Sequence, residues 1–137
     1  MTDSDIKKYT YPLKLTEADI DALGHVNNVV YLRWVQEAAE AHWNSLTTVT
    51  DRLELAWVVV RHEIDYFQAA KLNDQLVALT WVGETAGVKS IRFVQITNTQ
   101  GILFAQARTT WCLIDPVNQK PKRISPHIKK IFEVYTP

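Results

Sequence analysis

The stretch from Asn28 to Ser45, NVVYLRWVQEAAEAHWNS, decides the fold class of this chain. Its apolar side chains recur every three or four residues, and charged or amide side chains occupy the positions between them. The spacing predicts one long amphipathic helix. Three alanines within residues 38–41 keep the helix thin, so a sheet can pack closely around it. Arg33 and Glu37 are spaced to form an ion pair across one turn of this helix.

The sequence after this helix changes to segments rich in Val, Ile, Thr, Trp and Phe, which favour strands. Four strands are predicted, at Ala56–Tyr66, Gln75–Glu84, Val88–Thr97 and Ile102–Ile114. Short turn-forming links at residues 85–87 and 98–101 predict hairpins. We therefore expect successive strands to be antiparallel neighbours in a meander.

Two further elements are predicted at the ends of the chain. A strand at Tyr9–Leu15 precedes the helix, and Pro12 within it indicates a sheet edge or a strand end, because proline has no N–H for a ladder. Ser125 and Pro126 predict the start of a short helix that runs to Val134, since proline is favoured at the first helical position.

Together these elements predict an α+β fold, with an antiparallel sheet of about five strands wrapped around one long central helix. The length of 137 residues suits a single domain spanning residues 1–137. The apolar run Val58-Val59-Val60 would be awkward at an open sheet edge. We therefore expect two copies of the chain to join through this strand as a homodimer.

The composition argues against several classes of partner and cofactor. Fifteen basic and fifteen acidic residues cancel, so nucleic acid is not an expected partner. No apolar run reaches the roughly 20 residues that a membrane helix requires. The four histidines lack metal-ligand spacing, so neither a metal nor another cofactor is expected. The single cysteine, Cys112, and the polar first residues fit a reducing, cytoplasmic location.

The loop directly before the helix, Asp19-Ile20-Asp21-Ala22-Leu23-Gly24-His25-Val26-Asn27, carries the candidate chemistry. A helix begins with unpaired N–H groups and a partial positive charge, which stabilise an oxygen that develops negative charge. An acyl carbonyl could therefore lie with its oxygen on the N–H groups near Asn28. Asp21 would then attack the carbonyl or activate a water molecule.

Each of these residues also has a purely structural interpretation. An aspartate ahead of a helix, such as Asp21, is usually a turn or cap residue. His25 is more often a loop or packing residue, although its ordinary pKa near 6.5 suits a proton carrier. Asn27 and Asn28 can simply cap the helix. The residues alone leave both interpretations open.

The pattern Asp19-x-Asp21-x-x-Gly24-His25-Val26-Asn27-Asn28-x-x-Tyr31 resembles the signature of a known family. It is that of the hotdog-fold acyl-CoA thioesterases of the 4-hydroxybenzoyl-CoA thioesterase family. Segments at residues 56–60, 74–76, 89–90 and 112–115 follow in the order seen in that family. The resemblance therefore covers nearly the whole chain and implies a hotdog fold.

The resemblance implies hydrolysis of an acyl-CoA thioester to a free acid and coenzyme A. It makes Asp21 the catalytic carboxylate, as a nucleophile or as the general base for water. The N–H around Asn28 would polarise the thioester carbonyl, and His25 would complete the catalytic loop. Two other activities remain open: a hotdog hydratase or dehydratase acting on enoyl-CoA, and a non-catalytic module that binds acyl-CoA or lipid.

The resemblance also implies a set of substrate-binding residues and an assembly. The residues are Gly24 and Asn27 in the loop, Tyr31 at the acyl pocket, Val59 along the acyl tunnel, and Lys89 and Ser90 near the coenzyme A phosphates. On spacing alone, Lys89 and Ser90 are surface residues at a strand start, and Val59 is plain core. The active site would form between subunits of a homodimer or homotetramer.

Overall fold

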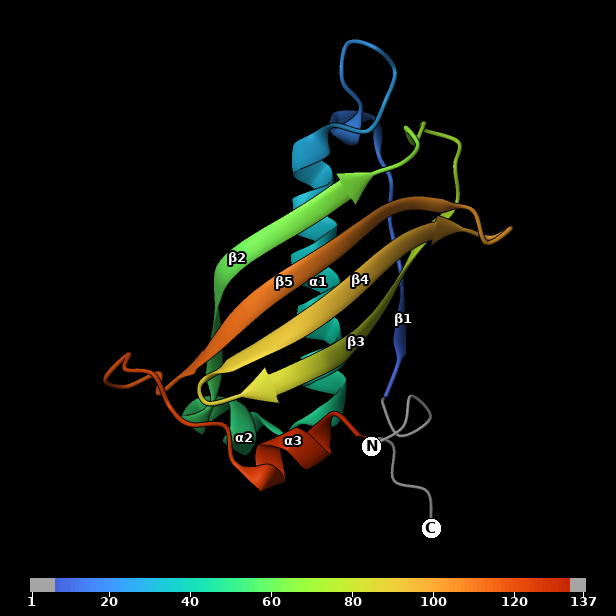
Figure 1. Cartoon of the computed structure of the whole chain (residues 1–137). Helices are drawn as coiled ribbons and strands as arrows, with labels where there is room; N and C mark the ends of the chain where they lie inside the picture. Colours follow the sequence, from blue (N-terminus) through green and yellow to red (C-terminus); the bar gives the residue numbers. More distant parts are fainter. Residues whose placement is uncertain (1–6, 134–137) are drawn as a thin grey trace.

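The computed structural model describes residues 7–133 of the chain (Figure 1). One long helix crosses one face of a curved five-stranded sheet, and two short helices lie near one end of it. The helices are η2 (Glu17–Asp19), α1 (Asn28–Leu46), α2 (Val49–Glu54) and α3 (Pro126–Ile131). The strands are β1 (Tyr9–Pro12), β2 (Ala56–Tyr66), β3 (Leu76–Ala86), β4 (Lys89–Asn98) and β5 (Leu103–Ile114). The predicted α+β class is confirmed.

Helix α1 forms where the apolar periodicity predicted it. Its first residue is Asn28, and its last, Leu46, lies one residue beyond the predicted end. Trp34 and Val35 are buried against the sheet, and Ala38 has no exposed surface. Arg33 Nε lies 3.5 Å from Glu37 Oε1, so the predicted ion pair is present.

The strand order β1-β3-β4-β5-β2 corrects the predicted meander. β3, β4 and β5 are antiparallel neighbours joined by hairpins, as predicted. β2, however, pairs with β5 and not with β3. The connection at residues 67–75 is long enough to carry the chain from one side of the sheet to the other. β2 and β1 are therefore the two edge strands.

The chain ends differ from the prediction in length. β1 lies at a sheet edge, as Pro12 indicated, but it ends at Pro12 and not at Leu15. The Leu13 N–H still donates to the Leu76 carbonyl at 3.1 Å, so pairing with β3 extends one residue past the proline. α3 has Ser125 as its cap and ends at Ile131. Val134, the predicted end of this helix, lies outside the described residues. The short helix α2 was not predicted.

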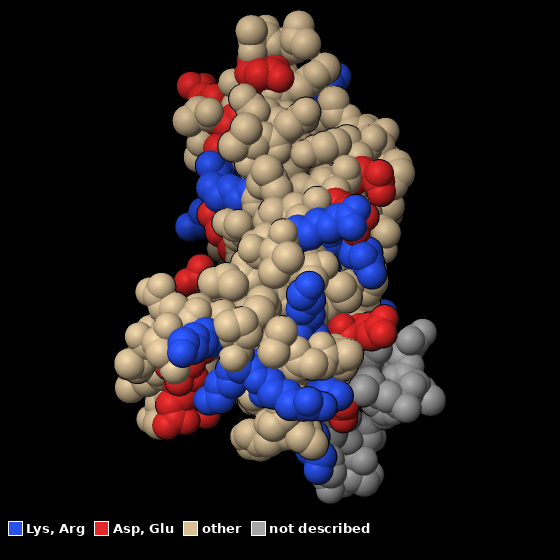
Figure 2. Space-filling model, turned by 60° about the vertical axis from the view of Figure 1, so that its left-hand side comes forward, with Lys and Arg blue, Asp and Glu red and all other residues tan. Residues whose placement is uncertain are grey.

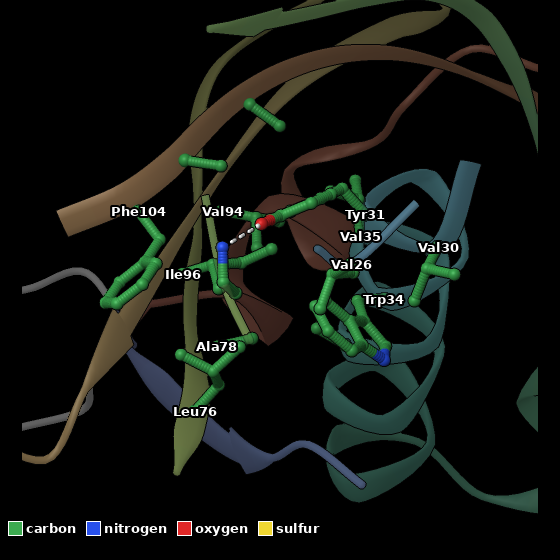
Figure 3. Packing of buried hydrophobic residues seen from close by; sticks show 14 residues of the cluster. Val26, Val30, Tyr31, Trp34, Val35, Leu76, Ala78, Val94, Ile96 and Phe104 are labelled. Carbon is green, nitrogen blue, oxygen red and sulfur yellow. Dashed lines mark hydrogen bonds between the residues drawn. The ribbon is translucent and has the colours of Figure 1, made fainter. Parts of the chain in front are cut away.

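The core has two parts, one toward each end of α1. The first surrounds Tyr31 and Trp34 and includes Phe104 from β5 and Ile96 from β4 (Figure 3). The second packs Trp43 of α1 against residues of β3, β5 and α3. The first core supports the loop that precedes α1, and the second supports the opposite end of the helix.

Candidate active site

The loop before α1 folds back on itself and is closed by backbone hydrogen bonds. The Asp21 N–H donates to the His25 carbonyl at 2.8 Å, and the Gly24 N–H donates to the Asp21 carbonyl at 3.1 Å. Gly24 has a φ of 79°, a left-handed conformation that favours glycine. The loop therefore holds Asp21 and His25 at a fixed separation.

The Asp21 carboxylate is anchored through one of its two oxygens. Its Oδ1 accepts hydrogen bonds from the Leu23 N–H at 2.9 Å and from the His25 N–H at 3.2 Å. Its Oδ2 accepts none from residues 7–133, and the residue is exposed. One oxygen thus fixes the orientation of the carboxylate, and the other is available to a reactant.

The first turn of α1 leaves one N–H available. The Asn27 side chain caps the helix by accepting from the Val29 N–H at 3.1 Å, and the Asn27 carbonyl accepts from the Val30 N–H at 2.9 Å. The Asn28 N–H donates to no described residue. Since the start of a helix carries partial positive charge, this N–H is suited to an oxygen that gains negative charge.

Asp21, His25, Asn28 and Tyr31 line one pocket of about 260 Å³. Tyr31 forms its inner wall, and its hydroxyl accepts a hydrogen bond from the Ala70 N–H at 3.3 Å (Figure 3). Burial raises the pKa of Tyr31, so the hydroxyl stays protonated at neutral pH. The pocket therefore combines a carboxylate, an available backbone donor and an aromatic wall.

Sequence reasoning missed the other wall of this pocket, which is formed by Tyr66, the last residue of β2, and by residues 67–69 that follow it. Tyr66 meets Tyr31 edge to face, with 5.3 Å between the ring centroids. The side chains of Tyr66 and Phe67 are 45% and 60% exposed. Two adjacent aromatic residues at the end of a predicted strand were the available signal, because such residues rarely remain exposed without a role.

The remaining predicted site residues do not line this pocket within one chain. Gly24 and Asn27 lie in the loop, as turn and cap. Val59 and Ser90 line a different cavity, at the other end of α1. Lys89 is exposed and Ser90 is buried, because successive residues of a strand point to opposite faces. Only Lys89 of this pair therefore faces solvent.

Asp19 anchors the start of the loop from a buried position. Its Oδ2 accepts from the Thr16 N–H at 3.0 Å, and its Oδ1 accepts from Arg33 Nη2 at 3.0 Å. Its carbonyl accepts from the Asn27 N–H at 2.9 Å. Burial raises the pKa of Asp19, but the hydrogen bonds from Thr16 and Arg33 outweigh it, and the pKa lies below its ordinary value. The residue is ionised and ties the loop to α1.

We expect Asp19→Asn to lower the free energy of unfolding by about 1–3 kcal/mol. The N–H₂ group of the new amide would face either the Thr16 N–H or the Arg33 guanidinium, and two donors cannot form a hydrogen bond with each other. Thermal or urea unfolding measures this change. The matched control is Glu37→Gln, which removes only the exposed ion pair with Arg33 and should cost under about 1 kcal/mol. Equal losses of unfolding free energy in the two variants would show that Asp19 does not anchor the loop to α1.

Comparison with known proteins places the chain in a family. Residues 15–132 match the Thioesterase-like superfamily. The chain belongs to this family. An acyl-CoA thioesterase, YbgC of Haemophilus influenzae, is 29% identical over 90% of this chain and 93% of its own length.

Two solved structures show that this thioesterase-like chain has the predicted hotdog fold. Slr0204 of Synechocystis, a 1,4-dihydroxy-2-naphthoyl-CoA thioesterase, superposes with a TM-score of 0.79 at 21% identity, covering 92% of this chain and 96% of its own. A 4-hydroxybenzoyl-CoA thioesterase mutant in complex with 4-hydroxybenzoyl-CoA superposes with a TM-score of 0.80 at 14% identity. This second match covers 91% of this chain and 98% of that structure, so both structures share the fold over nearly their full length.

No helix within residues 7–133 is long and apolar enough to cross a membrane. In the same part of the chain, no three His, Cys, Asp or Glu side chains gather in an arrangement that could hold a metal ion.

Proposed function

We propose that this chain hydrolyses an acyl-CoA thioester to a free acid and coenzyme A. The observation that carries the proposal is the pocket in which the Asp21 carboxylate and the unoccupied Asn28 N–H lie together. The thioester carbonyl oxygen would accept from this N–H, and the free carboxylate oxygen would act on the carbonyl carbon or on a water molecule. The family match and the acyl-CoA thioesterase relative support the same reaction.

The proposed roles of the other residues follow from their positions. Tyr31 would pack against the acyl group beside the reacting carbonyl, and Gly24 and Asn27 would hold the loop and the helix start. His25 lines the pocket and would position the carboxylate through its N–H. Lys89, which is exposed, would approach the coenzyme A phosphates.

The test is release of free thiol from a panel of short, long and aromatic acyl-CoA substrates. We expect thiol release that follows enzyme concentration for at least one acyl class. Loss of enoyl-CoA absorbance without thiol release would instead indicate a hydratase. Tight binding of every acyl-CoA without turnover would indicate a non-catalytic binding module, and either result would overturn the proposal.

We further propose that the active form is a homodimer joined through β2. β2 is an edge strand that pairs only with β5 among the described strands. Val58 and Val60 are 43% and 53% exposed on it. Figure 2 turns this side of the molecule forward, and wide uncharged areas separate its charged side chains. Antiparallel pairing of two β2 strands would also set the two α1 helices antiparallel, with the start of each beside the end of the other.

This arrangement would bring Val59 and Ser90 of one chain toward the Asp21 pocket of its partner. Predicted site residues that lie in two separate cavities of one chain would then lie close together across the dimer. A cytoplasmic location belongs to the same proposal, and the buried, unpaired Cys112 is compatible with a reducing compartment.

We expect sedimentation at micromolar concentration to give at least twice the 15.7 kDa mass of the chain. Replacing Val58 and Val60 together by lysine should yield a monomer and lower thiol release more than about tenfold, because charges on an edge strand oppose pairing. Ile102→Lys is the matched control, since Ile102 is 43% exposed in the link between β4 and β5, at the opposite end of β5 from the partner of Val58. A wild-type monomer with full activity would contradict the dimer.

A further inference from the structure

A second cavity, of about 560 Å³, lies at the end of α1 opposite the Asp21 loop. It shares no lining residue with the Asp21 pocket. Its walls come from α1, from α2, from Phe132 directly after α3, and from the adjoining ends of β2, β3, β4 and β5. Trp43, Trp57, Trp111 and Phe132 make these walls largely aromatic. The volume is in the range of natural small-molecule sites.

Arg92 of β4 lines this cavity and is buried, with 5% of its surface exposed. Its Nη1 donates to His42 Nδ1 at 2.9 Å and to Thr80 Oγ1 at 3.0 Å. Its Nε and Nη2 groups donate to no residue within 7–133, and no carboxylate in that range pairs with it. Two hydrogen bonds from Nη1 thus orient the guanidinium, and its Nε and Nη2 donors remain available to a ligand.

The two partners of Arg92 do not neutralise its charge. A guanidinium only donates, so His42 Nδ1 must be an unprotonated acceptor, and the imidazole is neutral. Thr80 is also neutral. Buried charges in proteins are normally paired with an opposite charge, because the loss of hydration is otherwise uncompensated. A buried arginine without a counter-ion beside an open cavity indicates that an anion completes the site.

Other polar groups of the cavity define the charge and shape of that anion. The indole Nε1 atoms of Trp57 and Trp111 are buried and have no acceptor among the described residues. Arg52, the second cation of the lining, already donates to the Thr47 carbonyl at 2.8 Å. Glu40 brings one negative charge to the lining. The two guanidinium groups and the one carboxylate of the lining leave one net positive charge, which favours a monoanion over a phosphate dianion.

We propose that this cavity binds the carboxylate of a molecule whose remaining part is apolar. The carboxylate pairs with the free edge of the Arg92 guanidinium, which matches its planar geometry. The apolar part packs against the aromatic walls. Two sources supply this chemistry: a free carboxylic acid, or a carboxylate at the far end of an acyl group. Binding of a free acid does not depend on the proposed hydrolysis. Binding of a carboxylate at the far end of an acyl group rests on it.

Calorimetric titration with octanoate and with the uncharged analogue octanamide tests the site on the wild-type protein. We expect one octanoate per chain and at least tenfold weaker binding of octanamide. Arg92→Gln should weaken octanoate at least tenfold, and circular dichroism checks that the variant is folded. Ala39→Leu, which adds a larger side chain to the wall at a buried lining position, should weaken both ligands.

Asp21→Asn separates this cavity from the Asp21 pocket. We expect it to alter octanoate binding far less than Arg92→Gln does, whereas an acid held in the Asp21 pocket would bind more tightly once the carboxylate is removed. Equal affinity for octanoate and octanamide, or an octanoate affinity that Arg92→Gln does not alter, overturns the proposal.

A kinetic comparison identifies the source of the carboxylate. It uses an acyl-CoA that ends in a carboxylate and its methyl ester of equal length. If the acyl end is the ligand, the wild type should prefer the acid at least tenfold in kcat/KM, and Arg92→Gln should abolish the preference. Equal rates, together with octanoate binding, assign the site to a free acid. Absence of all thiol release would count against the proposed hydrolysis, and octanoate binding would still stand.

Discussion

Asp21→Asn is expected to lower thiol release from the best acyl-CoA substrate by about 10²–10⁴-fold, the usual contribution of a positioned catalytic carboxylate. The amide oxygen can still accept from the Leu23 and His25 N–H groups, so the loop should keep its shape. The amide cannot act as a nucleophile or take a proton. The loss should therefore fall on kcat, with KM little changed.

The chain offers a matched control in Asp115→Asn. Asp115 Oδ1 accepts from the Val117 N–H at 2.8 Å, the same kind of turn bond that Asp21 makes. Asp115 does not line the Asp21 pocket, so its variant should retain thiol release. A folded Asp21→Asn enzyme with near wild-type turnover would remove Asp21 from the mechanism.

A second large effect is expected on the stability of the fold when the pH is lowered. His42 is buried, stacks on Tyr9 at 5.2 Å between centroids and accepts from Arg92. Burial, the Arg92 charge and the Lys7 charge lower the pKa of His42 from 6.5 to about 3. The unfolded chain takes up this proton below pH 6.5 and the folded chain does not, so stability falls as the pH falls from 6.5 toward 3.

Between pH 7 and pH 5 this single group should lower the free energy of unfolding by about 2 kcal/mol. Urea unfolding at a series of pH values in this interval, where most carboxylates remain ionised, measures the slope. Burial also lowers the pKa of His62, which adds a contribution of the same sign. The slope should therefore decrease, and not vanish, in His42→Gln.

The control for this experiment is His127→Gln, because His127 is exposed. The slope measured for this variant is the reference against which the slope of His42→Gln is compared. An unaltered slope in His42→Gln would mean that His42 takes up its proton equally in the folded and unfolded chain. The hydrogen bond in which it accepts from Arg92 could not then be present.

Several elements could be predicted because their evidence is local. The three- and four-residue period of residues 28–45 predicted α1, and β2 has the predicted bounds, Ala56–Tyr66. The Asp21 loop was predicted from its residue types, which suit a turn before a helix. The short helix α2 has a capping box at Thr48 and Asp51, a signal that the sequence contained and the prediction did not use.

The position of β2 could not be predicted in this way. Hairpin links report which strands are neighbours only when the link is short, and residues 67–75 form a longer connection. The same connection brings Phe67 and Gln68 to the Asp21 pocket, so the missed strand order and the missed pocket wall have one cause. The hydrogen bond between the neutral His42 and the charged Arg92 joins residues 50 positions apart, and no spacing rule connects them.

The sequence by itself determined the helix, the segments that form strands and the reactive loop, because periodicity and turn chemistry act over a few residues. Tertiary structure alone decided that β2 lies beside β5, that residues 66–69 wall the Asp21 pocket, and that Arg92 is buried with no carboxylate of residues 7–133 paired to it. These features depend on contacts between distant segments. Their free energy is gained only when the whole sheet closes around α1, so no local pattern in the chain records them.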